Sequence, residues 1–140
     1  MEEKNFTVGD FMATKLITMT EEMNIFDAVE TLLKNNISGA PVVNDKNEII
    51  GMFSERDCMK VAMDSAYHNQ PGGKVKEYMN KEIDTINPGM AITSVARKFF
   101  ETRFRRFPVV DKGKLVGQIS RHDVMKAIHE MKRSTWIPKK

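Results

Sequence analysis

A chain of 140 residues has the ordinary length of one domain, and it can bury a hydrophobic core without disulfides or a structural metal. Apolar residues make up 41% and charged residues 29%, as in soluble globular proteins, and no apolar run approaches the roughly 18 residues of a membrane span. The single cysteine, Cys58, excludes an internal disulfide, and the acidic start MEEKNFTVGDF does not fit a secretory signal. We therefore expect a cytoplasmic protein that does not enter a membrane.

The net charge of +3 conceals an uneven distribution of charge. Residues 1–70 hold 6 basic and 12 acidic side chains, a net charge of −6, whereas residues 71–140 hold 16 and 7, a net charge of +9. Two ordinary solvated faces explain this distribution as well as two more specific hypotheses do. The basic half can attract phosphate, or the two halves can attract each other across an interface.

The first predicted elements are a short helix over 8–12, a brief strand over 16–19 and an amphipathic helix that follows Asn24. Asn24 and Asp27 form a pair typical of a helix start. The helix prediction rests on apolar side chains that recur at 3.6-residue spacing along one face. These side chains are Ile25, Ala28, Val29, Leu32 and Leu33.

Two short strands and a second helix come next. Residues 40–43 and 49–53 are predicted as strands joined by a turn, and Pro41 suits the start of a strand, where no ladder donor is needed. Ser54 is an acceptable N-cap for a helix that continues through Met63. The segment 7–66 therefore has the order β-α-β-β-α.

The polar segment YHNQPGGK, residues 67–74, is predicted to be a linker because it is rich in Pro and Gly. Residues 75–132 then repeat the first unit, with 13 identities and one gap over about 55 positions, and residues 133–140 form a C-terminal tail. The identical residues in the first copy are Val8, Met12, Thr18, Met23, Ile25, Pro41, Val42, Val43, Gly51, Ser54, Asp57, Met59 and Lys60. Since a unit of roughly 60 residues buries little surface alone, we expect the two copies to pack into one module.

The stretches GMFSERDCMK (51–60) and GQISRHDVMK (117–126) carry the most specific part of the repeat. Ser54 and Ser120 end a strand, and Asp57 and Asp123 follow in the first helical turn, where free N–H groups and the helix dipole favour anions. A carboxylate can accept two hydrogen bonds from a vicinal diol, so the pattern fits a ribose-phosphate site. The alternative is a simple helix cap, which is the commoner meaning of S-x-x-D.

The doubled pattern of Met12 and Met79, Thr18 and Thr85, SGAPVV and RRFPVVD, and GMFSERD and GQISRHD resembles the cystathionine β-synthase (CBS) domain. The resemblance covers about residues 7–132, and two tandem copies of this domain form a Bateman module. It implies an α/β (α+β) fold of two β-α-β-β-α repeats packed with pseudo-twofold symmetry. It also implies that AMP, ADP, ATP or S-adenosylmethionine binds in clefts between the copies as a regulatory ligand, with no cofactor required.

The resemblance also assigns roles to residues of this chain. Asp57 and Asp123 are the expected ribose acceptors, Ser54 and Ser120 contact ribose or phosphate, and Thr18 and Thr85 touch the adenine edge. The segments before the prolines supply walls and backbone groups for the base: Ser38, Gly39 and Ala40 in the first copy, and Arg105, Arg106 and Phe107 in the second. Each cleft is expected to combine the Ser/Asp pair of one copy with the threonine and the pre-proline segment of the other.

The two clefts are expected to differ in charge. Arg103, Arg105 and Arg106 near Asp57 can grip phosphate bidentately, and Arg56 is a further candidate. The cleft of Asp123 has only Arg121 and His122 as nearby cations. We therefore hypothesise that the Asp57 cleft prefers charged nucleotides and that the Asp123 cleft is weaker or holds a less charged adenosine compound. Solvated arginines remain the alternative.

The sequence does not favour an enzyme, since it shows no catalytic triad, carboxylate pair, Walker loop or metal cluster. A stand-alone sensor that signals to an unidentified partner protein is the leading hypothesis. The alternative is a nucleic-acid-binding or protein-interaction adaptor that uses the basic second half. The resemblance further implies a homodimer, paired through helices whose apolar stripes lie within 57–63 and 123–131.

Overall fold

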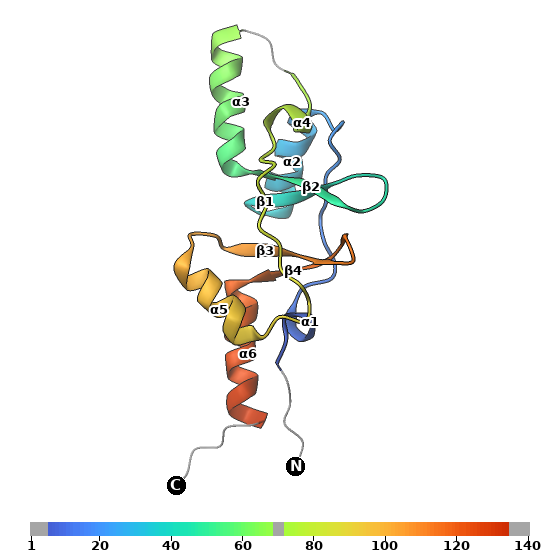
Figure 1. The fold of residues 1–140 in the computed structure, drawn as a ribbon. Helices are drawn as coiled ribbons and strands as arrows, with labels where there is room; N and C mark the ends of the chain where they lie inside the picture. The colour runs from blue at the N-terminus through green and yellow to red at the C-terminus, as the bar shows by residue number, and fades with distance from the viewer. Residues whose placement is uncertain (1–5, 69–71, 135–140) are drawn as a thin grey trace. The chain divides into compact units, whose positions relative to one another are not determined.

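Figure 1 shows the computed structural model of the chain, which describes residues 6–68 and 72–134. Contacts divide the chain into two compact units, one formed by Ile17–Ile83 and the other by Met1–Leu16 together with Asp84–Lys140. We call them the first unit and the second unit. Each contains a two-stranded antiparallel sheet, two longer helices and one helix of a single turn, so the predicted α/β class with a repeated unit is confirmed.

The first unit holds α2 (Ile25–Asn35), β1 (Gly39–Val43), β2 (Ile49–Ser54), α3 (Glu55–His68) and α4 (Val75–Tyr78). The predicted N-cap of α2 is confirmed, because the Phe26 N–H donates to Asn24 Oδ1 over 2.8 Å. Helix α2 ends at Asn36, whose φ of 53° is left-handed, as at many helix C-termini. Helix α3 is longer than the prediction and runs five residues past Met63.

The second unit repeats this arrangement with α1 (Val8–Phe11), α5 (Ile92–Glu101), β3 (Arg106–Asp111), β4 (Lys114–Ser120) and α6 (Arg121–Ser134). Both sheets carry a register shift at the equivalent place, between Val42 and Val43 and between Val109 and Val110. The strand predicted over 16–19 and its equivalent in the repeated unit, 83–86, are shorter than expected. Each is reduced to a single parallel bridge, at Met19 and at Ile86, that extends the sheet by one residue.

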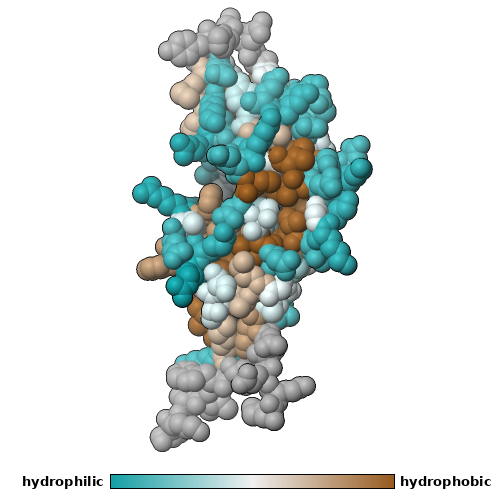
Figure 2. All heavy atoms as spheres, viewed as in Figure 1, coloured by the Kyte–Doolittle hydropathy of each residue, from teal (hydrophilic) through white to brown (hydrophobic). Residues whose placement is uncertain are grey.

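Each unit has its own hydrophobic core beneath its sheet, and polar side chains cover much of the surface visible in Figure 2. The apolar stripes predicted from helical spacing point into these cores, except that the prediction was wrong for Leu33, which is 78% exposed. Their buried members are Ile25, Ala28 and Leu32 on α2, and Ile92, Val95 and Phe99 on α5. Two predicted parts of the chain lie outside the described residues: residues 69–71 of the linker, and the C-terminal tail from residue 135 on, which includes Trp136.

The short helices α1 and α4 pack in the unit of the other sequence copy. Ala13, after α1, exchanges backbone hydrogen bonds of 2.8 and 2.9 Å with Gln118 of β4, and Asn80, after α4, does the same with Met52 of β2. Gly117 is required here, because a Cβ atom on it would lie 2.5 Å from Met12 Sδ and 2.9 Å from the Ala13 carbonyl oxygen. The repeated glycine and methionine of the sequence therefore serve this packing, and the compact units do not coincide with the sequence copies.

Candidate functional site

The Ser54–Asp57 corner lies where β2 ends and α3 begins. Asp57 is only 4% exposed, and its Oδ2 accepts hydrogen bonds from the Ser54 N–H at 2.8 Å and from the Ser54 hydroxyl at 3.1 Å. Its other oxygen, Oδ1, lies 3.9 Å from Lys60 Nζ, one helical turn on. Among the described residues no hydrogen bond reaches Oδ1, so this oxygen is oriented but uncommitted.

The Ser120–Asp123 corner repeats this geometry in the second unit. Asp123 Oδ2 accepts from the Ser120 N–H at 2.9 Å and from its hydroxyl at 3.0 Å, and Lys126 Nζ lies 3.8 Å from Oδ1. The Asp123 N–H also donates to Ser120 Oγ over 3.2 Å. These bonds are those of a helix cap, so the capping role weighed from the sequence is present. It occupies one carboxylate oxygen and leaves the second available to a ligand.

The first unit brings four of the predicted site segments together. Gly39 is paired with Ser54 across the β1–β2 ladder, and the Ser38 carbonyl accepts from the Glu55 N–H at 2.9 Å. Thr18 precedes Met19, whose N–H donates to the Pro41 carbonyl at 2.9 Å. Thr18, the segment 38–40, Ser54 and Asp57 thus gather around the start of β1, and the side chain of Ala40 is buried in the core.

The second unit gathers the equivalent residues around the start of β3. Arg106 is paired with Ser120, and the Arg105 carbonyl accepts from the first N–H of α6 at 3.2 Å. The side chain of Phe107 is 1% exposed and packs on Phe99 in the core, so only its backbone can face a ligand. The Arg106 Nε atom is buried, and among the described residues it has no hydrogen-bond partner.

An ion pair holds the segment that carries Thr85. Asp84, the residue before Thr85, receives two hydrogen bonds of 2.8 Å from Lys98 Nζ, and this ammonium group lies 5.4 Å from the centroid of the Phe107 ring. The first unit has Ile17 and Thr31 at the equivalent positions, so it cannot form this pair. This pair was not predictable from the sequence, since Asp84 and Lys98 are 14 residues apart and belong to different segments of the fold.

The remaining candidates lie at the surface near the corners. Arg56 and His122 are both exposed and are the second residues of α3 and α6. Burial raises the pKa of the Cys58 thiol, and the charges of Asp57 and Glu55 raise it further. Cys58 is therefore an uncharged thiol at neutral pH and a poor nucleophile.

Lys60 and Lys126 were not predicted as site residues. The available signal was their identity in the two copies, where each follows its aspartate by three residues. On a helix this spacing places the ammonium group over the carboxylate. The two lysines therefore supply positive charge beside the uncommitted Oδ1 atoms.

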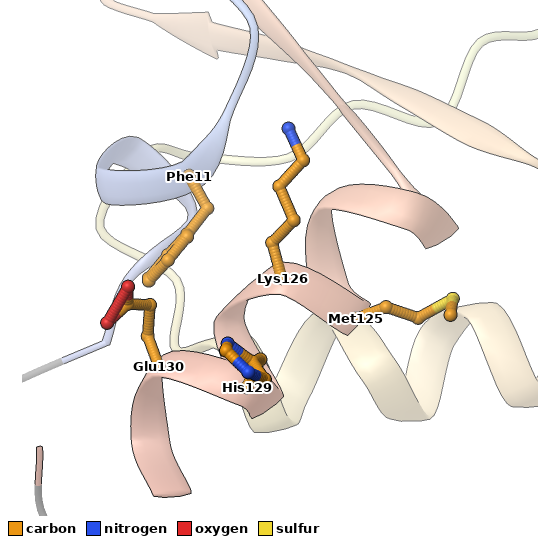
Figure 3. Close-up of a pocket in the computed structure, with 5 residues that line it drawn as sticks. All are labelled: Phe11, Met125, Lys126, His129 and Glu130. Atoms are coloured by element: carbon orange, nitrogen blue, oxygen red, sulfur yellow. The ribbon is translucent and has the colours of Figure 1, made fainter. Parts of the chain in front are cut away.

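Two surface hollows lie along α6, in the second unit. The first, of about 480 Å³, is lined by Phe11 of α1 and by Met125, Lys126, His129 and Glu130 (Figure 3). The second, of about 550 Å³, adds Ile128, Met131 and Lys132 to Met125 and His129. Neither Ser120 nor Asp123 lines either hollow. The sequence analysis did not predict these hollows.

The described residues contain no group of three or more His, Cys, Asp or Glu side chains that could hold a metal ion. No helix in the described part of the chain has the length and apolar character needed to cross a bilayer. The pairing of Ser54 and Asp57 with Thr85 and Arg105 joins residues of different units, and it stays a prediction. So does the equivalent pairing of Asp123.

Comparison with known proteins gives a consistent result. The sequence profile of the family described as CBS domain matches the chain twice, at residues 8–64 and 75–130. The uncharacterized protein MJ1225 of Methanocaldococcus jannaschii is 36% identical over 124 residues, which are 89% of this chain and 43% of that protein. YhcV of Bacillus subtilis, a CBS domain-containing protein, is 28% identical over 89% of this chain and 86% of its own length.

Among solved structures, the chain is similar to CBSX2 of Arabidopsis thaliana in complex with AMP. The TM-score is 0.80 and the identity 30%, over 91% of this chain and 99% of the CBSX2 chain in the crystal. The match covers 66% of the full CBSX2 sequence and 43% of MJ1225. The chain therefore spans less than two thirds of the length of these two relatives.

Proposed function

The chain belongs to the CBS domain family, and we propose that it is a regulatory module that binds an adenosine nucleotide through Asp57 and Asp123. The observation that carries the proposal is the state of these two carboxylates. Each is buried, held by its serine through Oδ2, and left with an uncommitted Oδ1 beside a lysine. A carboxylate held in this way can accept hydrogen bonds from a vicinal diol, and each unit has one.

AMP is the first ligand to test, because CBSX2, at 30% identity, was crystallised with AMP. The threonines Thr18 and Thr85 and the segments 38–40 and 105–107 then surround the base, as the family resemblance implies. ADP, ATP and S-adenosylmethionine share the adenosine part that these residues would recognise. The module changes none of these compounds chemically and uses their occupancy as a signal to a partner protein.

Calorimetry with AMP tests the proposal. Asp57→Asn and Asp123→Asn each keep an oxygen that can accept from the serine N–H, so the helix cap survives while the charge is lost. We expect each variant to lose about tenfold or more in affinity at its own site, which corresponds to about 1.4 kcal/mol. Wild-type affinity in the double variant would contradict the proposal.

Two controls keep this test specific. Melting curves of the unliganded variants show whether the fold is intact, and Asp45→Asn removes a carboxylate from the β1–β2 turn, at the other end of the strand pair from the Ser54–Asp57 corner. The nucleic-acid alternative makes a separate prediction, since RNA or DNA binding would depend on salt and survive the double substitution.

We further propose that the module is a homodimer. Large apolar side chains remain exposed on the outward sides of α3 and α6: Met59 and Met63 on α3, and Met125 and Ile128 on α6, each 56–64% exposed. Apolar patches of this kind are typical of interfaces. Light scattering at several protein concentrations tests the mass, and a monomer at all concentrations would contradict a homodimer.

A further inference from the structure

The place where the short helix meets the long helix differs between the two units. In the first unit the Tyr78 hydroxyl of α4 donates to Asp64 Oδ2 of α3 over 2.7 Å, so the two helices are joined there. The second unit has Phe11 of α1 and Glu130 of α6 at the equivalent positions. Phe11 has no hydroxyl and cannot form this bond, and both residues instead line the hollow of about 480 Å³.

The lining of this hollow is part apolar and part charged. Phe11 and Met125 offer a ring and a thioether, whereas Lys126, His129 and Glu130 offer an ammonium group, an imidazole and a carboxylate. Figure 3 shows the Phe11 side chain reaching from α1 toward Glu130. Phe11 and Glu130 are half-buried and the other three are exposed, so the hollow is open to a solute.

The ring and the ammonium group are both placed to meet a ligand. The Phe11 ring stacks on Phe6 with 5.7 Å between the centroids, which fixes its orientation. Lys126 Nζ lies 3.8 Å from Asp123 Oδ1, which is longer than a hydrogen bond. The ammonium group therefore keeps its donors for a further partner.

The imidazole is a second difference between the units. His129 stands where α3 has Met63, whereas Lys126 is matched by an identical residue, Lys60. The second unit has thus lost a hydroxyl bridge and gained a hydrogen-bonding ring at the same place. These two changes give the second unit a polar hollow at a place where the first unit has a bond between its helices.

We propose that this hollow is a binding site for an apolar α-amino acid. Lys126 pairs with the carboxylate of the ligand, Glu130 pairs with its ammonium group, and its side chain packs on the Phe11 ring. His129 adds a donor for the second carboxylate oxygen. The volume of about 480 Å³ lies within the roughly 300–1,000 Å³ of small-molecule sites.

The opposite charges of the lining select a zwitterion. A simple anion would meet Glu130 as a like charge, and a simple cation would meet Lys126 as a like charge. The proposal is separate from the nucleotide site, because neither Ser120 nor Asp123 lines the hollow.

Two-dimensional NMR of the full chain, titrated with L-phenylalanine, tests the proposal. We expect saturable shifts of the backbone amides of residues 11, 126, 129 and 130, with a dissociation constant on the order of 1 mM for a ligand of this size. 3-Phenylpropionate lacks the ammonium group and phenethylamine lacks the carboxylate, so each should bind up to about fivefold more weakly. Absence of saturable shifts at these amides would overturn the proposal, and so would equal affinity for all three compounds.

Two substitutions test the role of each charge. Glu130→Gln should weaken L-phenylalanine and spare 3-phenylpropionate, which has no ammonium group to lose a partner. Lys126→Met should weaken L-phenylalanine and spare phenethylamine, which has no carboxylate. A purely structural role would weaken all three compounds alike, so a uniform loss would overturn these assignments.

Phe11→Tyr places the ligand in the hollow itself. The added hydroxyl stands where the first unit has one, within the reach of Glu130, and should weaken L-phenylalanine several-fold by taking the place of its ammonium group. Tyr78→Phe is the matched control, because it removes the hydroxyl of the first unit and should leave binding in the second unit unchanged. Unchanged affinity in Phe11→Tyr, or an equal loss in both variants, would overturn the assignment of the ligand to this hollow.

Discussion

The two units share the two hydrogen bonds from serine to the aspartate Oδ2 at the Ser–Asp corner, and they differ in the side chains around it. Ser54 with Asp57 and Ser120 with Asp123 agree in every distance to within 0.1 Å. The segments beside them are small and neutral in the first unit, at 38–40, and basic and aromatic in the second, at 105–107. What the duplication preserved is therefore the support of the carboxylate, and what it changed is the chemistry offered to the rest of a ligand.

The largest effect on stability is expected from substituting the repeated glycine, and it should differ between the two units. A Cβ atom on Gly117 would lie 2.9 Å from a backbone oxygen of Ala13, whereas one on Gly51 would lie 3.1 Å from that of Asn80. Gly117→Ala should therefore lower the free energy of unfolding by about 2–3 kcal/mol, and Gly51→Ala by about 1–2 kcal/mol. Urea denaturation measures both.

Gly89→Ala is the matched control for these variants. Its added Cβ would meet only the side-chain oxygen of Asn87, at 3.1 Å; this oxygen accepts a 2.7 Å hydrogen bond from the Gly89 N–H and needs to shift by only a few tenths of an ångström. We expect a change within about 0.5 kcal/mol. If Gly117→Ala were as mild as this control, the close packing of α1 on β4 would not contribute to stability.

The next largest effect is expected on ATP affinity, from substitution of Arg105. Arg105 is exposed, and among the described residues it has no ion pair, so it is free to meet a phosphate. Arg105→Ala should weaken ATP binding about tenfold, or about 1.4 kcal/mol, and leave adenosine binding nearly unchanged, because only ATP carries the phosphates. Calorimetry with both compounds measures the difference.

Combining Arg105→Ala with each aspartate substitution sharpens the comparison. The family resemblance predicts that Arg105 shares a cleft with Asp57, so these two substitutions should be non-additive for ATP while Arg105→Ala and Asp123→Asn add. The opposite pattern would assign Arg105 to the Asp123 corner of its own unit. Loss of adenosine binding in Arg105→Ala would contradict a role in phosphate recognition.

The sequence predicted the features that depend on local spacing. Three of these features are confirmed: the N-cap of α2, the apolar stripes of α2 and α5 apart from the exposed Leu33, and the position of Ser54 at a strand end. The repeat itself was the strongest signal, because an unchanged carboxylate within changing surroundings indicates a constraint. A ligand-binding role for the Ser–Asp corner could not be separated from helix capping, since the same side chains perform both.

Features that depend on distant contacts were not predictable from spacing. Nothing in the order of elements indicates that α1 packs in the second unit and α4 in the first, because that choice depends on backbone contacts such as Ala13 with Gln118. The strands over 16–19 and 83–86 were too long in the prediction because only Met19 and Ile86 reach the sheet. The Asp84–Lys98 pair is a further example.

A smaller effect is expected for that ion pair. Lys98→Met removes two hydrogen bonds to Asp84, but the pair is 31% and 42% exposed, so it should contribute only about 0.5–1 kcal/mol. Lys34→Met removes the same charge from α2, where Lys34 forms no ion pair with any described residue, and serves as the control. The difference between the variants, measured by thermal unfolding, should shrink at high salt. Equal stabilities at low salt would show that the pair is not stabilising.

The smallest effect is expected at a cluster that only the first unit has. Glu22 accepts hydrogen bonds from Lys74 at 2.6 Å and Lys76 at 2.8 Å, where the second unit has Gly89 in place of the carboxylate. The hydrogen bond from Lys74, followed by that from Lys76, lowers the pKa of Glu22 from 4.5 to about 2. The folded state therefore binds this proton less readily than the unfolded state does.

It follows that Glu22 stabilises the fold above about pH 4.5 and that this contribution disappears as the pH falls toward 2. All three side chains are exposed, so the gain over Glu22→Gln should be small even at neutral pH. Melting temperatures of both proteins between pH 2 and 7 measure it, and the two curves should converge at the acid end. Curves that stay parallel would show that protonation of Glu22 does not affect the stability of the fold. The Glu22 cluster of the first unit would then not be an electrostatic counterpart of the Asp84–Lys98 pair in the second.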